Sequence, residues 1–221
     1  RTGSGKSIML SAFVLGMVAR YSPEKINFLL MDFKGGATFP RYEKLPHVIA
    51  SLSNLEESMD LLDRAFLIIQ GEIARRQEIL DEHDCKDIRE YRKKRASNPS
   101  MEPLPYLFLV VDEFREFITQ HREYLKLFES IAAVGRSLGF HMMLVSQFVD
   151  SSLIGEASSQ IGFGVSLTVA NPAQSRGVIG IDEAANLPSG KGDAIINYKE
   201  GPLAEQHSHL CLLYTSDAAD E

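Results

Sequence analysis

The 221-residue sequence predicts an α/β fold with a mostly parallel sheet covered by helices on both faces. Three observations lead to this prediction. Apolar runs of strand length alternate with longer helical segments, the strongest runs end in acidic residues, and a phosphate-loop sequence opens the chain just before an apolar helix. Strands joined by such long crossovers are normally parallel. With 44% apolar residues, the chain can form the core of one large domain.

The phosphate-loop sequence is Arg-Thr-Gly-Ser-Gly-Lys-Ser, residues 1 to 7. It matches the pattern G-x-x-x-x-G-K-[ST], except that the leading glycine and the strand feeding the loop would precede Arg1. Glycines let the backbone N–H groups converge, a lysine reaches the β- and γ-phosphates, and a serine hydroxyl binds Mg²⁺ at a helix N-terminus. We therefore predict nucleotide contacts from Thr2, Gly3, Ser4, Gly5, Lys6, Ser7 and Ile8, with Ser7 also a metal ligand. A Gly/Ser-rich turn with a chance Lys-Ser is the alternative.

The first half of the chain predicts three helices and two strands. The strand at 26–31 is an almost continuous apolar run that ends in Asp32, as buried parallel strands do. Asn54 and Glu57 resemble a capping box at the start of the long second helix. The expected elements are a helix at 7–20, a strand at 26–31, a short strand at 47–50, a helix at about 55–81 and a basic helix at 87–95.

The second half begins with the strongest strand signal, at 106–111, which ends in Asp112-Glu113. We expect a helix at 121–138, strands at 142–146 and 161–169, a short helix at 175–179 and a final strand at 194–198. In parallel sheets, ligands bind at the carboxyl ends of strands. Asp32, Asp112 and Gln147 all follow strands at such ends.

The acid pair completes the predicted nucleotide site. Asp112 at a strand tip can hold Mg²⁺ opposite Ser7, and Glu113 can polarise a water for attack on the γ-phosphate. Lys6, Glu113 and Gln147 are thus the candidate catalytic residues, with Gln147 as a γ-phosphate sensor. A plain strand-capping role is the alternative for Gln147. The cofactors implied are ATP and Mg²⁺.

Two arginines, Arg136 and Arg176, are candidates for arginine fingers that act across a subunit boundary. Surface or intrasubunit ion pairs are the more common use of such arginines.

Composition excludes some functions. No run of about 18 apolar residues occurs, so no membrane span is expected in this piece, and no signal peptide opens it. Cys85 and Cys211 have neither metal nor disulfide spacing. The net charge of −7 gives no support to a broad nucleic-acid-binding face.

The last eleven residues, 211–221, resemble the translation of a transposon-type sequencing adapter. We expect an amino-terminally truncated ATPase domain at 1–210 and a non-native tail at 211–221; a short native strand with a polar terminus is the alternative. Without the tail, 27 acidic residues face 23 basic ones, a net charge of −4. Hydrolysis is expected of the intact protein, and this fragment, with its incomplete loop, can be inactive.

Several blocks of the sequence resemble the FtsK/SpoIIIE family of motor ATPases, and most closely its type VII (ESX) secretion branch, the EccC/EssC proteins. The resemblance covers about residues 1 to 200. One departure follows Gln147, where Phe148 replaces the arginine usual in the family. The blocks are Thr-Gly-Ser-Gly-Lys-Ser, the stretch 27–36 ending in Asp-Phe-Lys-Gly-Gly, Lys44–Val48, Val111–Phe114, Val134–Gly139, Arg75–Leu80, Ser175-Arg176 and Leu187-Pro188.

This resemblance implies a RecA-like P-loop fold and a ring, usually a hexamer, with nucleotide at subunit interfaces. It also implies a membrane-anchored parent with several such modules, whose ATPase domains lie on the cytoplasmic face of the bacterial membrane. The expected function is ATP hydrolysis coupled to export of small helical proteins, with components of the membrane secretion complex as partners. Two alternatives remain: a double-stranded DNA translocase, and a weakly hydrolysing, ATP-gated regulatory module, which Phe148 favours.

Overall fold

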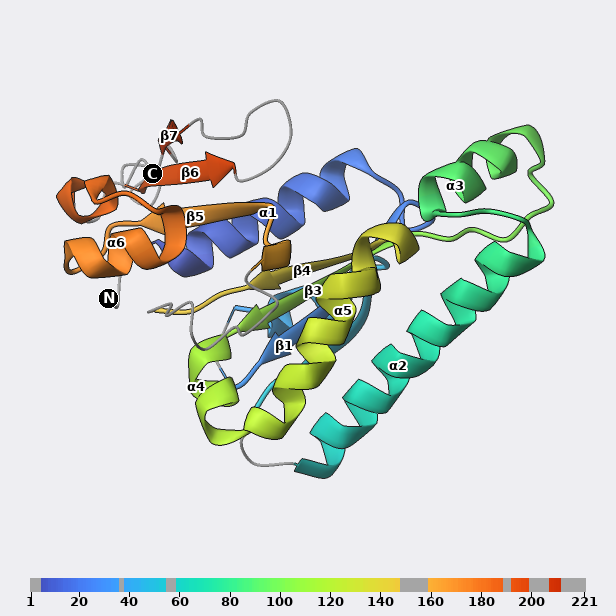
Figure 1. Cartoon of the computed structure of the whole chain (residues 1–221), viewed down its shortest axis with the longest axis horizontal. Coiled ribbons are helices and arrows are strands. Elements are labelled where there is room, and N and C mark those ends of the chain that lie inside the picture. Colours follow the sequence, from blue (N-terminus) through green and yellow to red (C-terminus); the bar gives the residue numbers. More distant parts are fainter. Residues whose placement is uncertain are drawn as a thin grey trace. The chain divides into compact units, whose positions relative to one another are not determined.

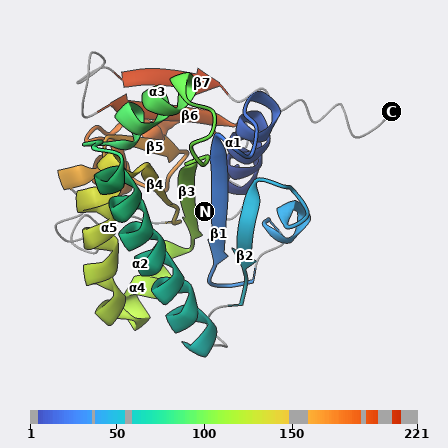
Figure 2. The ribbon, with the colours of Figure 1, turned by 90° about the vertical axis from the view of Figure 1, so that its right-hand side faces the viewer.

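The computed structural model describes residues 5–35, 38–54, 59–147, 159–188, 192–198 and 207–211. The chain forms two compact units. The first comprises Arg1–Phe13 together with Gln147–Glu221, and the second comprises Val14–Ser146. Figure 1 labels most of the helices and strands of both, and Figure 2 also labels β2.

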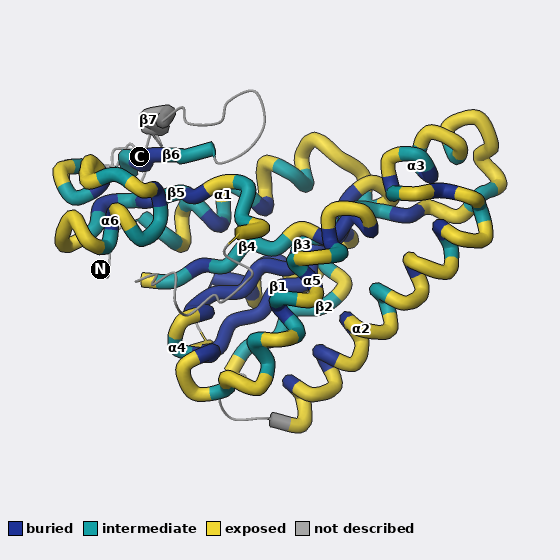
Figure 3. Tube along the Cα trace, viewed as in Figure 1, coloured by how far each residue is buried: buried dark blue, intermediate teal, exposed yellow. Residues whose placement is uncertain are grey.

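The second unit is built on a four-stranded sheet of order β2-β1-β3-β4, and every pairing in it is parallel. Its two central strands are the apolar runs, which are buried in Figure 3, and each is paired with a strand on both edges. The prediction of a mostly parallel sheet is confirmed. The strands are β1 (Ile26–Asp32), β2 (Val48–Leu52), β3 (Tyr106–Asp112) and β4 (Phe140–Leu144).

Helices α2 (Met59–Glu82) and α5 (Leu125–Leu138) pack side by side on one face of this sheet, as Figure 2 shows. In the sequence, the short helix α3 (Ile88–Ser97) follows α2 and precedes β3. Asp87 caps its start, where the Asp87 carboxylate accepts a hydrogen bond from the Glu90 amide at 2.9 Å. The 3-10 turn η1 spans Pro40–Tyr42.

The segment after β3 differs from the prediction. Instead of one helix at 121–138, the chain forms α4 (Phe114–Gln120), a 3-10 turn η3 (Arg122–Tyr124) and then α5. Helix α4 has only seven residues, too few for helical periodicity to stand out in the sequence. It forms because its apolar side chains, Phe114, Phe117 and Ile118, are buried in the core.

The first unit contains an antiparallel sheet of order β5-β6-β7. Strand β7 pairs with β6, so the expectation that the strand at 194–198 is the last one is wrong. A small core of Ile179, Ala184 and Ile195 lies between this sheet and its helices. The elements are α1 (Lys6–Arg20), which continues into the second unit, β5 (Phe163–Leu167), α6 (Pro172–Ile179), η6 (Glu183–Asn186), β6 (Asp193–Tyr198) and β7 (His207–Cys211).

Two local predictions change at helix starts. Helix α6 begins at Pro172 rather than at Ser175, because the Asn171 side chain accepts a hydrogen bond from the Gln174 amide at 3.0 Å. Asn54 has a left-handed backbone, with φ of 55°, which an N-cap residue does not have. Its supposed capping partner, Glu57, lies outside the described residues.

Candidate nucleotide site

The acidic ends of β1 and β3 lie next to each other. The parallel register aligns Asp32 with Asp112, and both side chains are buried, at 2% and 5% exposure. One oxygen of each carboxylate accepts a backbone hydrogen bond, from the Lys34 amide at 3.0 Å and from the Glu113 amide at 2.8 Å. Two buried carboxylates at adjacent strand ends form an oxygen-rich edge of the kind that hard cations prefer. Sequence reasoning placed Asp32 at this edge but gave it no role.

Glu113 follows directly, with φ of 57° and ψ of 36°, in the left-handed region that side-chain-bearing residues seldom adopt. It is 8% exposed. The next residue, Phe114, donates its amide to the Val145 carbonyl at 3.0 Å, and the Val145 amide donates to the Val111 carbonyl at 2.8 Å. These bonds tie the turn at Glu113 to the chain that leaves β4, at the carboxyl edge of the sheet.

The loop after β1 also needs an unusual backbone. Gly35 has φ of 69°, and a Cβ on it would lie 1.5 Å from the Asn54 side-chain oxygen. No residue but glycine fits there, because both the backbone angle and the close approach exclude a side chain. The glycine in the Asp-Phe-Lys-Gly-Gly block therefore lets the loops after β1 and β2 approach each other.

The phosphate-loop residues lie in the other unit. Helix α1 begins at Lys6, and the Gly5 carbonyl accepts its first hydrogen bond, from the Met9 amide at 2.9 Å. Gly5 has φ of 91°, and a Cβ on it would meet nothing within 4 Å. Glycine is thus needed for its conformation, and the space beside it is open to a ligand. Ile8 is 44% exposed, whereas Thr2, Gly3 and Ser4 lie outside the described residues.

The structure therefore brings Asp112 and Glu113 together with Asp32 in one unit. Lys6, Ser7 and Gln147 belong to the other unit, so their placement beside the acid pair stays a prediction. Gln147 is exposed, a short distance along the chain after β4 ends at Leu144. Phe148 lies outside the described residues.

The two candidate arginine fingers have different surroundings. Arg176 lies in α6 and pairs with Asp182 of the same chain at 2.5 Å, which is the ion-pair alternative considered for it. Arg136 is exposed in the last turn of α5.

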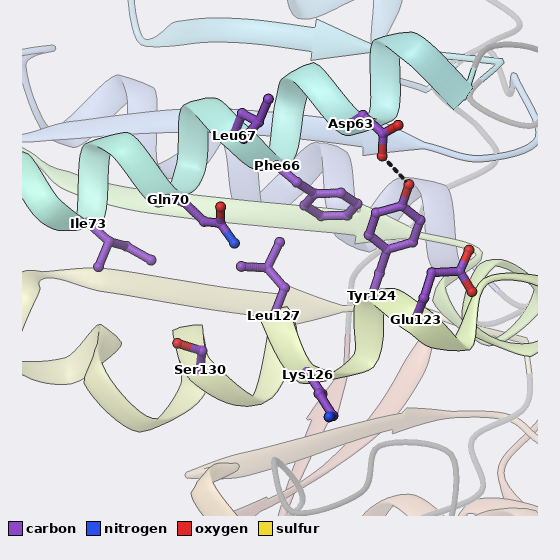
Figure 4. Close-up of a pocket in the computed structure, with 10 residues that line it drawn as sticks. All are labelled: Asp63, Phe66, Leu67, Gln70, Ile73, Glu123, Tyr124, Lys126, Leu127 and Ser130. Carbon is purple, nitrogen blue, oxygen red and sulfur yellow. Dashed lines mark hydrogen bonds between the residues drawn. The ribbon is translucent and has the colours of Figure 1, made fainter.

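A separate cleft of about 630 Å³ lies between α2 and the η3–α5 segment, and it contains none of the predicted site residues (Figure 4). The Tyr124 hydroxyl donates a hydrogen bond to the Asp63 carboxylate across it. Burial, together with this carboxylate, raises the pKa of Tyr124 to about 12. The lining residues are Asp63, Phe66, Leu67, Gln70, Ile73, Glu123, Tyr124, Lys126, Leu127 and Ser130.

Two kinds of feature are absent from the described residues. They contain no group of three or more His, Cys, Asp or Glu side chains placed to hold a metal ion. None of the helices in the same part of the chain combines the length and the apolar character needed to cross a bilayer.

The parallel sheet, its acidic strand ends and the Gly-Lys-Ser start of α1 are features of the P-loop fold of the RecA-like type. The chain belongs to the FtsK/SpoIIIE family, whose pattern matches residues 1–151. It is 37% identical over 221 residues to the ESX secretion system protein EccC of Thermomonospora curvata, covering 100% of this chain and 16% of that protein. It is 39% identical over 203 residues to the ESX-4 secretion system protein EccC4 of Mycobacterium tuberculosis, covering 91% of this chain and 16% of that protein.

Solved structures agree with this assignment. The cytoplasmic domain of the Thermomonospora curvata type VII secretion ATPase EccC superposes with a TM-score of 0.89 at 36% identity, covering 97% of this chain and 25% of that one. The pCW3 conjugation coupling protein TcpA superposes with a TM-score of 0.75 at 23% identity, covering 99% and 60% of the two chains, and shows the shared fold. The chain spans about one sixth of the length of the two curated relatives, 16% in each case.

Proposed function

We propose that this chain is an ATP-binding and ATP-hydrolysing module of a type VII secretion motor, in which hydrolysis drives protein export. The observation that carries the proposal is the buried acid pair Asp112-Glu113 at the end of β3, in register with Asp32. The names of the relatives, ESX secretion proteins at 37% and 39% identity, supply the biological setting. Because the chain spans a small part of those proteins, the activity of the whole protein is part of the proposal.

Each predicted site residue has a role in it. Lys6 and the backbone from Thr2 to Ile8 hold the phosphates, and Ser7 and Asp112 supply oxygen ligands for Mg²⁺, which neutralises charge on the phosphates when bound. The residues fit these ligands, since a hydroxyl and a carboxylate are what Mg²⁺ prefers and open space lies beside Gly5. Glu113 accepts a proton from the attacking water, and Gln147 senses the γ-phosphate.

The larger assembly follows from the family. We propose that several such modules form a ring, a hexamer in the simplest case, at the cytoplasmic face of the membrane. ATP binding closes the interface between neighbouring modules, and loss of the γ-phosphate opens it and moves the exported chain. Small helical secreted proteins and membrane components of the secretion complex are the proposed partners.

The test is ATP hydrolysis by the intact protein and by its Glu113→Gln and Lys6→Ala variants. Glu113→Gln should bind ATP normally and hydrolyse it about 10²- to 10⁴-fold more slowly, because only the proton acceptor is lost. Lys6→Ala should lose ATP affinity as well. Glu43→Gln, which removes an exposed carboxylate in the turn after η1, is the matched control and should be unchanged.

The other outcomes separate the alternative functions. Hydrolysis by Glu113→Gln at the wild-type rate would contradict the catalytic role. ATP binding with equally slow turnover in the wild-type protein and in Glu113→Gln would indicate a regulatory module. Salt-dependent stimulation of hydrolysis by double-stranded DNA would indicate a DNA translocase.

A further inference from the structure

Glu113 is the N-cap residue directly before helix α4, so whatever holds α4 also sets the position of Glu113. The Glu113 carbonyl accepts hydrogen bonds from the Glu116 and Phe117 amides at 3.1 and 3.2 Å. Glu113 itself has a left-handed backbone, a conformation that persists only where the surroundings enforce it. Since α4 has only seven residues, its own hydrogen bonds cannot provide that enforcement.

The loop after β1 contacts α4 through two consecutive residues. The Phe33 ring stacks on the Phe117 ring, with centroids 3.8 Å apart and planes 19° from parallel. Next to it, the Lys34 ammonium lies 2.5 Å from an oxygen of the Glu116 carboxylate. One apolar and one ionic contact, between neighbouring residues on each side, oppose both sliding and rotation of α4.

The aromatic contact and the ionic contact differ in how far their side chains are buried. Phe33 and Phe117 are almost completely buried, at 1% and 2% exposure. The Lys34 and Glu116 side chains are 46% and 36% exposed, but the Glu116 oxygen that faces Lys34 is itself buried. Neutralising Lys34 would therefore leave a negatively charged oxygen buried without this compensating cation.

The loop is in turn anchored to the sheet. The Lys34 amide donates to the Asp32 carboxylate at 3.0 Å, and Asp32 is aligned with Asp112 on the neighbouring strand. The loop therefore spans from the acidic strand end to the helix that follows Glu113. These contacts give the Asp-Phe-Lys-Gly-Gly block a structural role that the proposed nucleotide contacts do not explain.

We propose that Lys34 and Phe33 are positioning residues for Glu113: through Glu116 and Phe117 they hold α4 so that the Glu113 carboxylate stays aligned for attack on the γ-phosphate. The inference rests on the proposed hydrolysis. Lys34 acts through Glu116, so the proposal requires opposite charges at positions 34 and 116, in either order. Direct contact of Lys34 with the phosphates would instead require a positive charge at position 34 itself.

The experiment measures steady-state ATP hydrolysis by the intact protein carrying Lys34→Gln, Glu116→Gln, or the exchanged pair Lys34→Glu with Glu116→Lys. Each single variant should lower kcat about tenfold and change KM for ATP less than about twofold, because alignment is lost while ground-state binding is kept. The exchanged pair should recover to within about threefold of the wild type, since it restores the ion pair. Arg89→Gln removes the ion pair between the exposed Arg89 side chain and Asp87, the N-cap residue of α3; it is the matched control, expected at the wild-type rate.

Three results would overturn the inference. A higher KM with unchanged kcat in Lys34→Gln would mean that Lys34 binds the nucleotide. An exchanged pair as impaired as Lys34→Gln would mean that the lysine charge is needed by itself. Single variants with wild-type kcat and KM would mean that the ion pair has no role in catalysis.

A second measurement separates failure of this inference from failure of the proposed function. Hydrogen exchange of the α4 amides at 114–120 needs no hydrolysis: it should be faster in Lys34→Gln than in wild type, and slow again in the exchanged pair. Unchanged exchange in Lys34→Gln contradicts the positioning role. A wild-type protein no more active than Glu113→Gln contradicts the proposed function, whatever the exchange shows.

Discussion

At the scale of single residues, Arg76 has a structural role that the sequence does not indicate, because the adjacent residue is also an arginine. In the pair Arg75-Arg76, the first side chain is 45% exposed and the second only 2%. Arg76 donates to the Glu72 carboxylate at 2.8 Å and to the Leu138 carbonyl at 2.9 Å, and it lies over the Phe140 ring. Burial lowers the pKa of Arg76, opposed by Glu72. One side chain thus joins α2, the end of α5 and β4.

Arg76→Ala should therefore lower the free energy of unfolding by about 3 kcal/mol, because it leaves the Glu72 carboxylate and the Leu138 carbonyl without this donor. Arg75→Ala is the matched control, since it removes an exposed arginine that also bonds Glu72, and should cost less than about 1 kcal/mol. Urea unfolding of the two variants measures the difference. Equal losses of unfolding free energy in the two variants would show that the burial of Arg76 adds nothing to stability.

At the scale of elements, the end of α2 is a complete Schellman motif without its usual glycine. The Cys85 amide bonds the Leu80 carbonyl at 2.8 Å, and the Asp84 amide bonds the Asp81 carbonyl at 3.1 Å. Asp84 therefore has φ of 48°, where glycine is normally found. The Lys94 ammonium adds bonds to the His83 and Asp84 carbonyls, at 2.7 and 3.0 Å.

Asp84→Gly should stabilise the domain by about 0.5 kcal/mol, because glycine adopts this backbone without steric cost. Asp84→Ala removes the same carboxylate without relieving the backbone, and should destabilise it. Thermal unfolding of the two variants, compared with the wild type, tests the sign of each change. A lower midpoint for Asp84→Gly would mean that the carboxylate itself stabilises this turn.

Similar side-chain hydrogen bonds to backbone carbonyls account for basic residues of α3. Several of the basic residues in this helix donate to backbone carbonyls and so serve the fold. Lys94 caps α2, Arg92 donates to the Lys25 carbonyl at 3.0 Å and lies over the Tyr106 ring, and Arg95 bonds the Met101 carbonyl at 3.0 Å. Lys94 thus supplies a cationic donor at the carbonyl end of α2, where helix carbonyls lack intrahelical partners.

At the scale of the whole molecule, the proposed function predicts that Mg²⁺ and ATP stabilise the domain within the intact protein. A ligand that binds only the folded state at about a hundred times its Kd stabilises it by about 2.7 kcal/mol, so exchange of the β3 amides through full opening should slow about a hundredfold. Lys6→Ala should abolish the effect at the same ATP concentration. Equal protection of the wild type and Lys6→Ala would contradict phosphate binding at the start of α1.

Much of the parallel sheet was predictable from the sequence, because buried parallel strands consist of nearly continuous runs of apolar residues. Strands β1 and β3 and their acidic ends appear in the sequence almost as they do in the structure. Helix α4 and strand β7 were not predictable. Helix α4 has only seven residues, fewer than the window over which helical periodicity is recognised. Strand β7 (His207–Cys211) precedes the expected tail except at Cys211, and its sequence His-Ser-His-Leu-Cys is not an apolar run.

The sequence by itself determined the fold class, the family and the residue types of the nucleotide site, because short-range patterns encode strand burial, helix starts and phosphate-loop chemistry. Tertiary structure alone decided the register that aligns Asp32 with Asp112 and the contacts of Lys34 and Phe33 with α4. It also decided which of two adjacent arginines is buried. These features join residues far apart in the chain, and only packing, which no local pattern records, brings them together.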